Sequence, residues 1–237
     1  MKQLHSLQLR ILKKLLFAQE LRYTDLKPDP KMENNLLDFH LNRLIKEGYI
    51  QKGKRHYSLT NQGKEYANRM DTKQILITNQ SKVSVWICCQ KTQETSQKYL
   101  IYTRLKQPFY GCQGFITGKV KFGEKVINAA NRELKEEAGL EGNPQIITIK
   151  HYLVFDRKSK KLVEDKFMFL CLVKDPEGKL KARTKEGKLK WVDKKDLKSY
   201  VTNHFESFSS FREQLKQIKN FKGEVTFLEI NYLSSKF

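Results

Sequence analysis

The sequence predicts an α+β protein built from two domains. Three observations lead to this expectation. The first seventy residues carry apolar side chains at helical spacing and end in a short hairpin pattern. The residues from 83 onward form strand-like runs separated by polar turns. One glutamate-rich helical segment interrupts those strands. A length of 237 residues suits two small domains. We expect one domain at residues 1–72, a linker at 73–82 and a second domain at 83–237.

The N-terminal region is expected to be mainly helical. Apolar residues recur at steps of three and four: Leu4, Leu7, Ile11, Leu12, Leu15 and Leu16. A short second helix begins near 22–25 and stops at the prolines of 27–30. A third helix at 33–47 ends before Gly48. Strands at 49–51 and 56–59 then flank a basic turn at 52–55, and Thr60 caps a last helix.

This order of helices and a basic hairpin resembles the winged-helix domains of bacterial and archaeal regulators. The resemblance implies that the helix at 33–47 enters the major groove of double-stranded DNA and that the basic turn contacts the backbone or minor groove. The candidate DNA contacts are Asn34, Asn35, His40, Asn42 and Arg43 on the helix and Lys52, Lys54 and Arg55 on the turn. A module for protein contact or dimerisation is the alternative.

The second domain reads as a series of strands. Strands are expected at 83–89, 99–104, 146–155, 166–173 and 189–192, with a polar turn at 90–98, a basic turn at 156–161 and a helix beginning at 194–200. The C-terminal residues 205–237 predict a helix at 209–218 and a strand at 224–232. This segment either extends the second domain or forms a homodimer interface.

The segment from Gly118 to Leu140 carries the candidate chemistry. Residues 126–138 favour a helix, on which Glu133 and Glu137 lie one turn apart with Glu136 beside them. Carboxylates at that spacing repel one another, and a hard divalent cation such as Mg²⁺ would offset the repulsion. A glycine-containing loop before the helix lets backbone approach a phosphate closely. The glutamates alone are more typical of a solvent-facing acidic helix, and it is the full spacing of the segment that reverses this interpretation.

That spacing is the pattern of the Nudix box: a glycine, five residues, a glutamate, seven residues, and then Arg-Glu-apolar-x-Glu-Glu-x-Gly-apolar. Here these positions are Gly118, Glu124 and the run RELKEEAGL at 132–140. The chain therefore resembles the Nudix hydrolases over about residues 81–200. The resemblance implies a mixed sheet between helices and hydrolysis of a nucleoside diphosphate linked to another group.

The same resemblance implies roles for individual residues. Glu136 and Glu137 would be ligands of Mg²⁺ or Mn²⁺, and Glu133 a ligand or the base that activates water. Arg132 would orient Glu133, Glu124 would brace the loop and the helix, and the carbonyl of Thr117 or Gly118 would complete the coordination. Glu186, five residues before Trp191, is the candidate for a further acid. Candidate substrate contacts are Arg104, Phe115 and Lys119, while Tyr102, Phe109 and Tyr110 stack on a nucleobase or belong to the core.

Composition narrows the partners. A net charge of +20, from 46 basic and 26 acidic residues, attracts polyanions and nucleotides, and it is spread over both domains. The four cysteines have no zinc-site spacing and are expected to be free and buried. No apolar run is long enough to span a membrane, and we expect a cytoplasmic protein.

Three functions remain open from the sequence. One is a nucleotide pyrophosphohydrolase that a winged helix targets or regulates. The second is a transcription regulator that senses a nucleotide with little or no hydrolysis, and the third is an enzyme acting on RNA ends. The complete set of acidic box positions favours the enzyme, because a pure sensor has no need of them.

Overall fold

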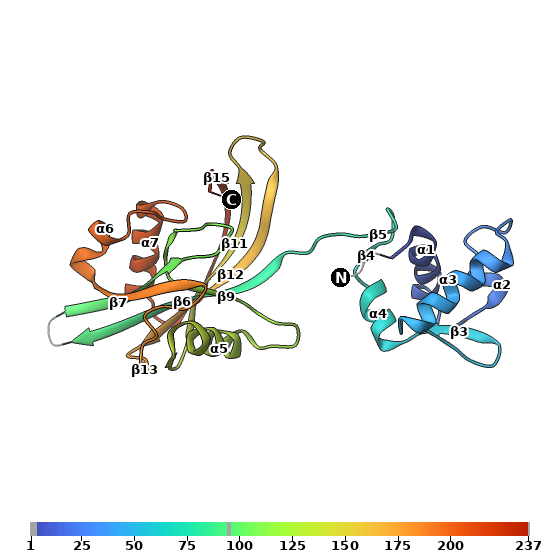
Figure 1. Cartoon of the computed structure of the whole chain (residues 1–237), viewed down its shortest axis with the longest axis horizontal. Helices are drawn as coiled ribbons and strands as arrows, with labels where there is room; N and C mark the ends of the chain where they lie inside the picture. The colour runs from blue at the N-terminus through green and yellow to red at the C-terminus, as the bar shows by residue number, and fades with distance from the viewer. Residues whose placement is uncertain (1–3, 94–95, 237) are drawn as a thin grey trace. The chain divides into compact units, whose positions relative to one another are not determined.

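The computed structural model describes residues 4–93 and 96–236, so that residues 1–3, 94–95 and 237 lie outside the description. The chain divides into two compact units, Met1–Asn79 and Gln80–Phe237 (Figure 1). Each unit has a hydrophobic core of its own. In the described part of the chain, no helix is both long enough and apolar enough to cross a membrane.

The first unit packs four helices against a three-stranded antiparallel sheet. The helices are α1 (Ser6–Leu16), α2 (Tyr23–Leu26), α3 (Asn34–Lys46) and α4 (Asn61–Ala67), and the strands are β1 (Leu21–Arg22), β2 (Ile50–Lys52) and β3 (His56–Leu59), in the order β1-β3-β2. Leu12, Leu26, Leu37 and Leu44 are fully buried between them. The Thr60 side chain accepts a hydrogen bond from the backbone N–H of Gly63 and caps α4, as the sequence predicts.

The segment expected as a linker contains structure of its own. β5 (Leu76–Ile77) folds back and pairs antiparallel with β4 (Met70–Asp71), and Met70 is buried in the core of the first unit. The first strand of the second unit, β6 (Lys82–Gln93), starts within the expected linker range. The linker without strand structure is therefore shorter than the range 73–82 that the sequence predicts.

The second unit is built on a mixed sheet of eight strands. Its main path runs β14-β7-β6-β12-β11-β15, with β8 added beside β7 and β9 beside β6. The bounds are β7 (Ser96–Arg104), β8 (Gln113–Gly114), β9 (Ile116–Lys119), β11 (Gln145–Asp156), β12 (Leu162–Lys174), β14 (Gly187–Asp193) and β15 (Thr226–Ser234). A small pair, β10 (Leu140–Glu141) and β13 (Glu177–Gly178), lies outside this sheet. Strands β6 and β12 pair in parallel, as do β11 and β15, whereas the other pairs are antiparallel.

Helices cover both faces of this sheet (Figure 1). Helix α5 (Val126–Ala138) packs against Val85 and Ile87 of β6, while α6 (Leu197–Tyr200), which follows the 3-10 turn Lys194–Asp196, and α7 (Phe208–Lys219) pack on the side of Trp86 and Cys88. Successive strand residues point to opposite faces, so one buried strand supplies both cores. This layering is the mixed sheet between helices that the sequence predicts.

The C-terminal residues complete the sheet. β15 pairs in parallel with β11 from Thr226 to Ser234, and it forms the edge of the sheet. The sequence left two roles open for residues 205–237, and in the structure they extend the second unit. The strands expected at 83–89, 146–155 and 166–173 are longer than predicted, and residues 94–95 of the polar turn at 90–98 lie outside the description.

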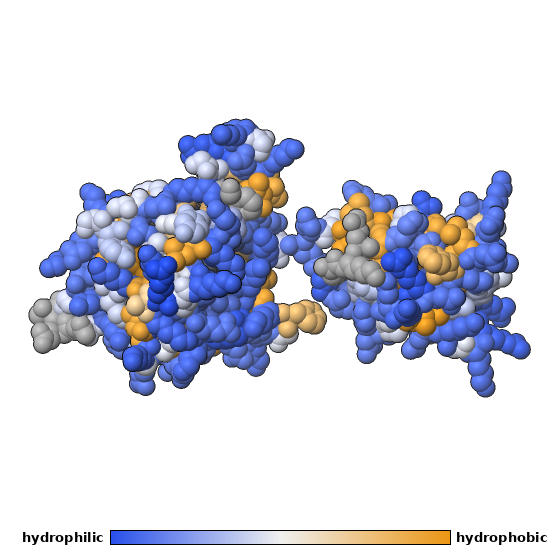
Figure 2. Space-filling view, in the orientation of Figure 1, coloured by the Kyte–Doolittle hydropathy of each residue, from blue (hydrophilic) through white to orange (hydrophobic). Residues whose placement is uncertain are grey.

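All four cysteines are free and buried, as expected. Burial raises the pKa of the Cys89 and Cys171 thiols to about 12, so both stay protonated at neutral pH. The exposed face of both units is mainly hydrophilic in Figure 2, in keeping with the high proportion of charged residues.

Candidate active site

Helix α5 holds the candidate catalytic residues in one place. Its buried face consists of Ala129, Ala130, Leu134 and Ala138, which pack on the sheet. The remaining positions of the helix then carry Arg132, Glu133, Glu136 and Glu137. The helix ends at Gly139, whose φ of 69° places it in the left-handed region that ends many helices. The spacing of Arg132, Glu133, Glu136 and Glu137 in the sequence therefore places these four residues on one side of the helix.

Arg132 connects three of the four box carboxylates. Its Nε and Nη2 donate to the two oxygens of Glu124 at 2.7 and 2.9 Å, and its Nη1 donates to Glu133 at 2.7 Å and to Glu136 at 3.1 Å. Nη2 also donates to the backbone carbonyl of Lys119 at 2.9 Å. All five N–H donors of a guanidinium therefore have an acceptor, which fixes the orientation of the side chain.

Glu124 joins the loop before α5 to the helix. Besides the two bonds from Arg132, it accepts the backbone N–H of Lys121 at 2.9 Å. The Arg132 guanidinium and then the Lys121 N–H lower the pKa of Glu124 to about 2. Glu124 is therefore an ionised anchor at neutral pH, in the position expected of a residue that braces the loop.

Gly118 and Glu133 are in close contact. A Cβ atom at Gly118 would lie 2.0 Å from the carboxyl carbon of Glu133. A side chain at this position would displace the Glu133 carboxylate, so glycine is what allows Glu133 to lie where it does. Thr117 and Gly118 both lie on β9 and line the same cavity as Glu133.

Glu137 lies deeper and has a different partner. The Thr184 hydroxyl donates to Glu137 Oε2 at 3.0 Å, and the same hydroxyl oxygen accepts the backbone N–H groups of Glu186 and Gly187. Burial raises the pKa of Glu137, the bond from Thr184 lowers it, and the nearby carboxylates of Glu186 and Glu133 raise it. Sequence reasoning missed Thr184, whose only signal was its place two residues before Glu186.

Glu186 is at the rim of the same cavity. Its side chain is half-exposed and pairs with Lys106 at 2.7 Å, a surface ion pair of a kind that contributes little to stability. Its backbone carbonyl accepts hydrogen bonds from the Tyr102 hydroxyl at 2.8 Å and from the Leu105 N–H at 2.7 Å. These two bonds hold the loop so that Glu186 lies near Glu137.

A cavity of about 560 Å³ extends from these carboxylates to α7. Its size is in the range of small-molecule sites. The carboxylates that line it are Glu133, Glu136, Glu137, Glu164, Glu186 and Glu206. Within residues 4–93 and 96–236, no three acidic, histidine or cysteine side chains converge closely enough to form a ready metal site, and Arg132 binds Glu133 and Glu136. The donor set is nonetheless made of hard oxygens crowded by like charge, and this chemistry fits Mg²⁺ or Mn²⁺.

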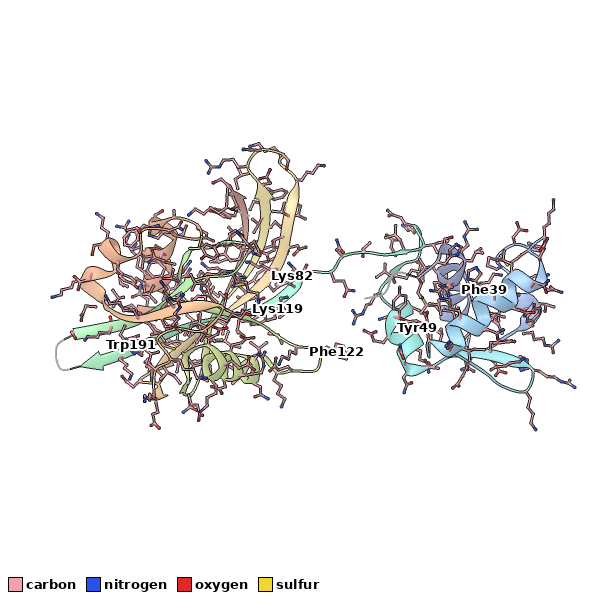
Figure 3. The ribbon with its side chains drawn as sticks, in the orientation of Figure 1. Phe39, Tyr49, Lys82, Lys119, Phe122 and Trp191 are labelled. Atoms are coloured by element: carbon pink, nitrogen blue, oxygen red, sulfur yellow. The ribbon has the colours of Figure 1, made fainter. Side chains whose placement is uncertain are left out.

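The expected substrate contacts differ in their exposure. Arg104 donates from Nε to the Pro108 carbonyl at 2.8 Å and lines the cavity. Lys119 is exposed at the end of β9, where it pairs with Ser84 of β6, and Lys82 lies two residues earlier on β6 (Figure 3). Lys82 and Lys119 both line the cavity. Phe115 is 2% exposed and packs between Trp86 and Phe211 with ring centroids 6.0 and 5.1 Å away. Phe115 thus packs in the core, as do the buried Tyr102 and Phe109, and all three residues line the cavity.

One of the expected DNA contacts is wrong. His40 is 5% exposed, stacks on His5 at 4.7 Å, and has its pKa lowered by burial. It follows Leu37 by three residues and precedes Leu44 by four, which is the spacing of the buried face of α3. The other candidates are exposed: Asn34, Asn35, Asn42, Arg43, Lys52, Lys54 and Arg55. The same exposed side of α3 carries Phe39, which Figure 3 labels, with 58% of its surface accessible.

Comparison with known proteins matches the second unit. Residues 78–211 match the model of the NUDIX domain. Over 107 residues, the chain is 27% identical to YvcI, an uncharacterized Nudix hydrolase of Bacillus subtilis; the match covers 45% of this chain and 65% of that relative, less than two thirds of its length. The structure of the mutator MutT protein from Bacillus halodurans superposes with a TM-score of 0.52 at 18% identity, covering 66% of this chain and 93% of that one. The NUDIX domain of Shewanella oneidensis NrtR, solved with ADP ribose, gives 0.49 at 14% identity, covering 65% and 95%.

The likeness to the Bacillus halodurans protein shows a common fold, in agreement with the mixed sheet and its two layers of helices. The family model matches more than half of the chain and includes all of β9, the loop and α5, where the arginine and the carboxylates meet. The chain therefore belongs to the Nudix family, as its sequence predicts.

Proposed function

We propose that this chain is a metal-dependent pyrophosphohydrolase that cleaves a nucleoside diphosphate linked to another group. The observation that carries the proposal is the joint lining of one cavity by the box carboxylates and by a set of aromatic side chains. Such a cavity has a charged end for a diphosphate and an apolar end for a nucleoside. Its volume of about 560 Å³ suits a molecule of that size.

In this proposal, Glu136 and Glu137 would hold Mg²⁺ or Mn²⁺, with the carbonyl of Thr117 or Gly118 as a further ligand. Glu133 would be a ligand or the base that activates water, and Glu186 an additional acid. The bound cation supplies positive charge beside the diphosphate and lowers the pKa of water. Lys82, Lys119 and Arg104 line the cavity and bind phosphate oxygens. Burial first, and then the carboxylates of Glu186 and Glu133, raise the pKa of Glu137, and a cation bound beside it would favour its ionised form.

The reaction is then a displacement at phosphorus. Glu133 accepts a proton from water, the water oxygen bonds to phosphorus, and the anhydride P–O bond breaks so that the leaving phosphate keeps the electron pair. Arg132 keeps Glu133 in position through the 2.7 Å bond, and Glu124 keeps Arg132 in position. A network of this kind lowers the cost of reorganisation during the reaction.

We also propose that the first unit, Met1–Asn79, is a winged-helix domain that binds double-stranded DNA. Asn35, Asn42 and Arg43 of α3 would contact the major groove, and Lys52, Lys54 and Arg55 the backbone. Their exposure and the sheet order β1-β3-β2 with a basic turn between β2 and β3 support this proposal. The exposed Phe39 and Leu36 favour the alternative of a protein-binding surface.

The test of the enzyme is release of phosphate or nucleotide from nucleoside triphosphates, ADP-ribose, NAD and dinucleoside polyphosphates, with Mg²⁺ or Mn²⁺. Glu133→Gln and Glu137→Gln should each lower turnover by about 10²–10⁴-fold, the range typical of such groups. Glu141→Gln is the matched control, because Glu141 is exposed, pairs with Lys135 and is not among the residues that line the cavity. Wild-type turnover in both box variants would contradict the proposal. Nucleotide binding without turnover would favour a nucleotide-sensing regulator.

A further inference from the structure

The two edge strands of the large sheet differ in how their outer sides are occupied. The outer side of β14 is covered by the segment before it, since the Leu189 N–H donates to the Ala182 carbonyl at 2.8 Å. An isolated β-bridge also joins Arg183 to Lys188. β14 in addition carries the exposed lysines Lys188 and Lys190. Lysines and covering loops are common means by which proteins prevent an edge strand from pairing with another chain.

The other edge strand, β15, is not protected in this way. In the described part of the chain, β11 is the only strand that pairs with β15. β15 is 9 residues long and contains a single charged residue, Glu229. Phe227, Leu228 and Leu233 are 55%, 37% and 44% exposed. A long apolar edge of this kind is a template for a strand from another chain.

The backbone of β15 directs hydrogen-bonding groups outward at alternate residues. The Ser234 carbonyl accepts the N–H of Arg157, which directly follows β11, at 2.8 Å, so Ser234 bonds towards β11. The backbone groups of successive strand residues point to opposite sides, and β15 pairs with β11 without a register shift. The odd-numbered residues from 227 to 233 therefore direct their N–H and C=O groups away from β11.

A second, antiparallel copy of β15 matches this edge in one register. A two-fold axis at Ile230 brings outward-directed residues opposite one another. The pairs across this axis are Phe227 with Leu233, Leu228 with Tyr232, Glu229 with Asn231, Thr226 with Ser234, and Ile230 with itself. An axis at Glu229 would place two carboxylates face to face, and an axis at Asn231 would place Glu229 against Leu233. The Ile230 register matches apolar with apolar and polar with polar side chains, which is the favourable arrangement for cross-strand neighbours.

We infer that β15 is a self-association interface, at which two copies of this chain form a two-fold symmetric dimer by antiparallel pairing around Ile230. Most homo-oligomers are closed assemblies of this kind, in which the same patch of each copy meets itself. Glu229 is held in place by His151, whose Nδ1 lies 3.2 Å from Glu229 Oε1. The Asn231 amide of the second copy then donates to the Glu229 carboxylate. The inference concerns the sheet edge and does not depend on the proposed hydrolysis.

The first test is sedimentation velocity of the full chain across the micromolar range. The protein is treated with nuclease beforehand, so that nucleic acid cannot bridge two cationic chains. The sedimenting mass should rise from that of one chain to that of two as concentration increases. A chain that stays monomeric throughout would overturn the inference.

Two variants at Asn231, which is exposed, test the register. Asn231→Lys places an ammonium group opposite Glu229 of the second copy and should retain or strengthen the dimer. Asn231→Glu places like charges opposite each other at two symmetric positions and should dimerise roughly tenfold more weakly than Asn231→Lys. General repulsion between chains of net charge +20 predicts the reverse order, because the lysine adds to that charge. Equal dimerisation of the two variants, or the reverse order, would contradict the pairing of Glu229 with Asn231.

Cross-linking tests the position of the axis. In this register Ile230 faces itself in a non-hydrogen-bonded pair, whose Cα atoms are about 4.5 Å apart and thus within reach of a disulfide. Ile230→Cys should therefore give a covalent dimer when a thiol oxidant is added. Leu228→Cys is the matched control, because its own counterpart lies about 13 Å away along the strand, and the wild type with its four buried cysteines is the blank. Equal cross-linking of the two variants, or none in either, would refute the axis at Ile230.

Discussion

At the scale of single residues, Arg132 explains why the box needs its exact composition. One guanidinium orients Glu124, Glu133 and Glu136 and also binds the Lys119 carbonyl. Lysine has the charge but not the planar fork of donors. The sequence identified all of these residues and the link between Arg132 and Glu133. The bond to Glu136 and the role of Thr184 could not be read from spacing, because they depend on rotamers and on a loop from a distant part of the chain.

Glu124 should make stability depend on pH in an acidic window. Its pKa is lowered to about 2 from the ordinary value of 4.5. A carboxyl with a lowered pKa stabilises the folded state fully above its ordinary pKa, and this stabilisation is lost as pH falls towards the folded value. Glu124→Gln should therefore be less stable than wild type at pH 6, and the difference should be much smaller at pH 3. Urea unfolding at both pH values measures this, and an equal difference at the two would contradict the assignment.

Gly118→Ala should reduce turnover without unfolding the chain. The added methyl would overlap the carboxyl group of Glu133 and move it. Displacing a catalytic group by about 1 Å costs on the order of 10²-fold in rate. Gly114→Ala is the control, because a methyl there would meet nothing within 4 Å. Activity assays on both variants make the comparison, and equal rates for the two would show that the contact with Glu133 is unimportant.

At the scale of elements, the sequence predicted α5 and its end correctly because the helix is determined locally. Alternation of buried alanines and leucine with charged residues sets its face, and Gly139 sets its end. The lengths of β11 and β12 and the parallel pairing of β15 with β11 were not predictable in this way. Strand pairing depends on partners that are distant in the sequence.

Gly139→Ala should destabilise the second unit by more than its backbone strain alone. A residue with a Cβ in the left-handed region costs roughly 1–2 kcal/mol. The methyl would in addition lie 2.8 Å from the Lys179 carbonyl. Gly123→Ala provides the comparison, since Gly123 has a similar φ of 78° but open space around a Cβ. Denaturant unfolding of both variants should show the larger loss for Gly139→Ala, and the reverse order would contradict this account of the helix end.

At the scale of the whole molecule, the net charge of +20 is spread over both units. Charge alone therefore does not assign polyanion binding to either one. In the first unit, the exposed basic residues of the turn between β2 and β3 form the candidate surface for binding a polyanion. His40 is buried, and its burial excludes it from the proposed DNA-binding surface.

Replacing Lys52, Lys54 and Arg55 together with alanine in the full chain should weaken binding to double-stranded DNA. The slope of log affinity against log salt concentration should decrease by roughly one for each phosphate contact that is lost. Arg157, Lys158 and Lys161 replaced in the same way remove equal charge from an exposed turn of the second unit. Fluorescence anisotropy over a salt series measures both triple variants. Equal weakening by the two would indicate a general charge effect and would contradict DNA binding through the β2–β3 turn.

By itself, the sequence determined the two-domain α+β organisation, most helix bounds and the family, because helix periodicity, caps and the spacing of the box are local properties. It also identified the residues that share one helix face. Only the tertiary structure brought Thr184 and Glu186 to Glu137, buried His40 and Phe115, and enclosed Glu206 and Gln214 around the far end of the cavity. The reason is that these contacts join segments far apart in the chain, and their geometry is fixed by how the sheet and its two layers of helices pack.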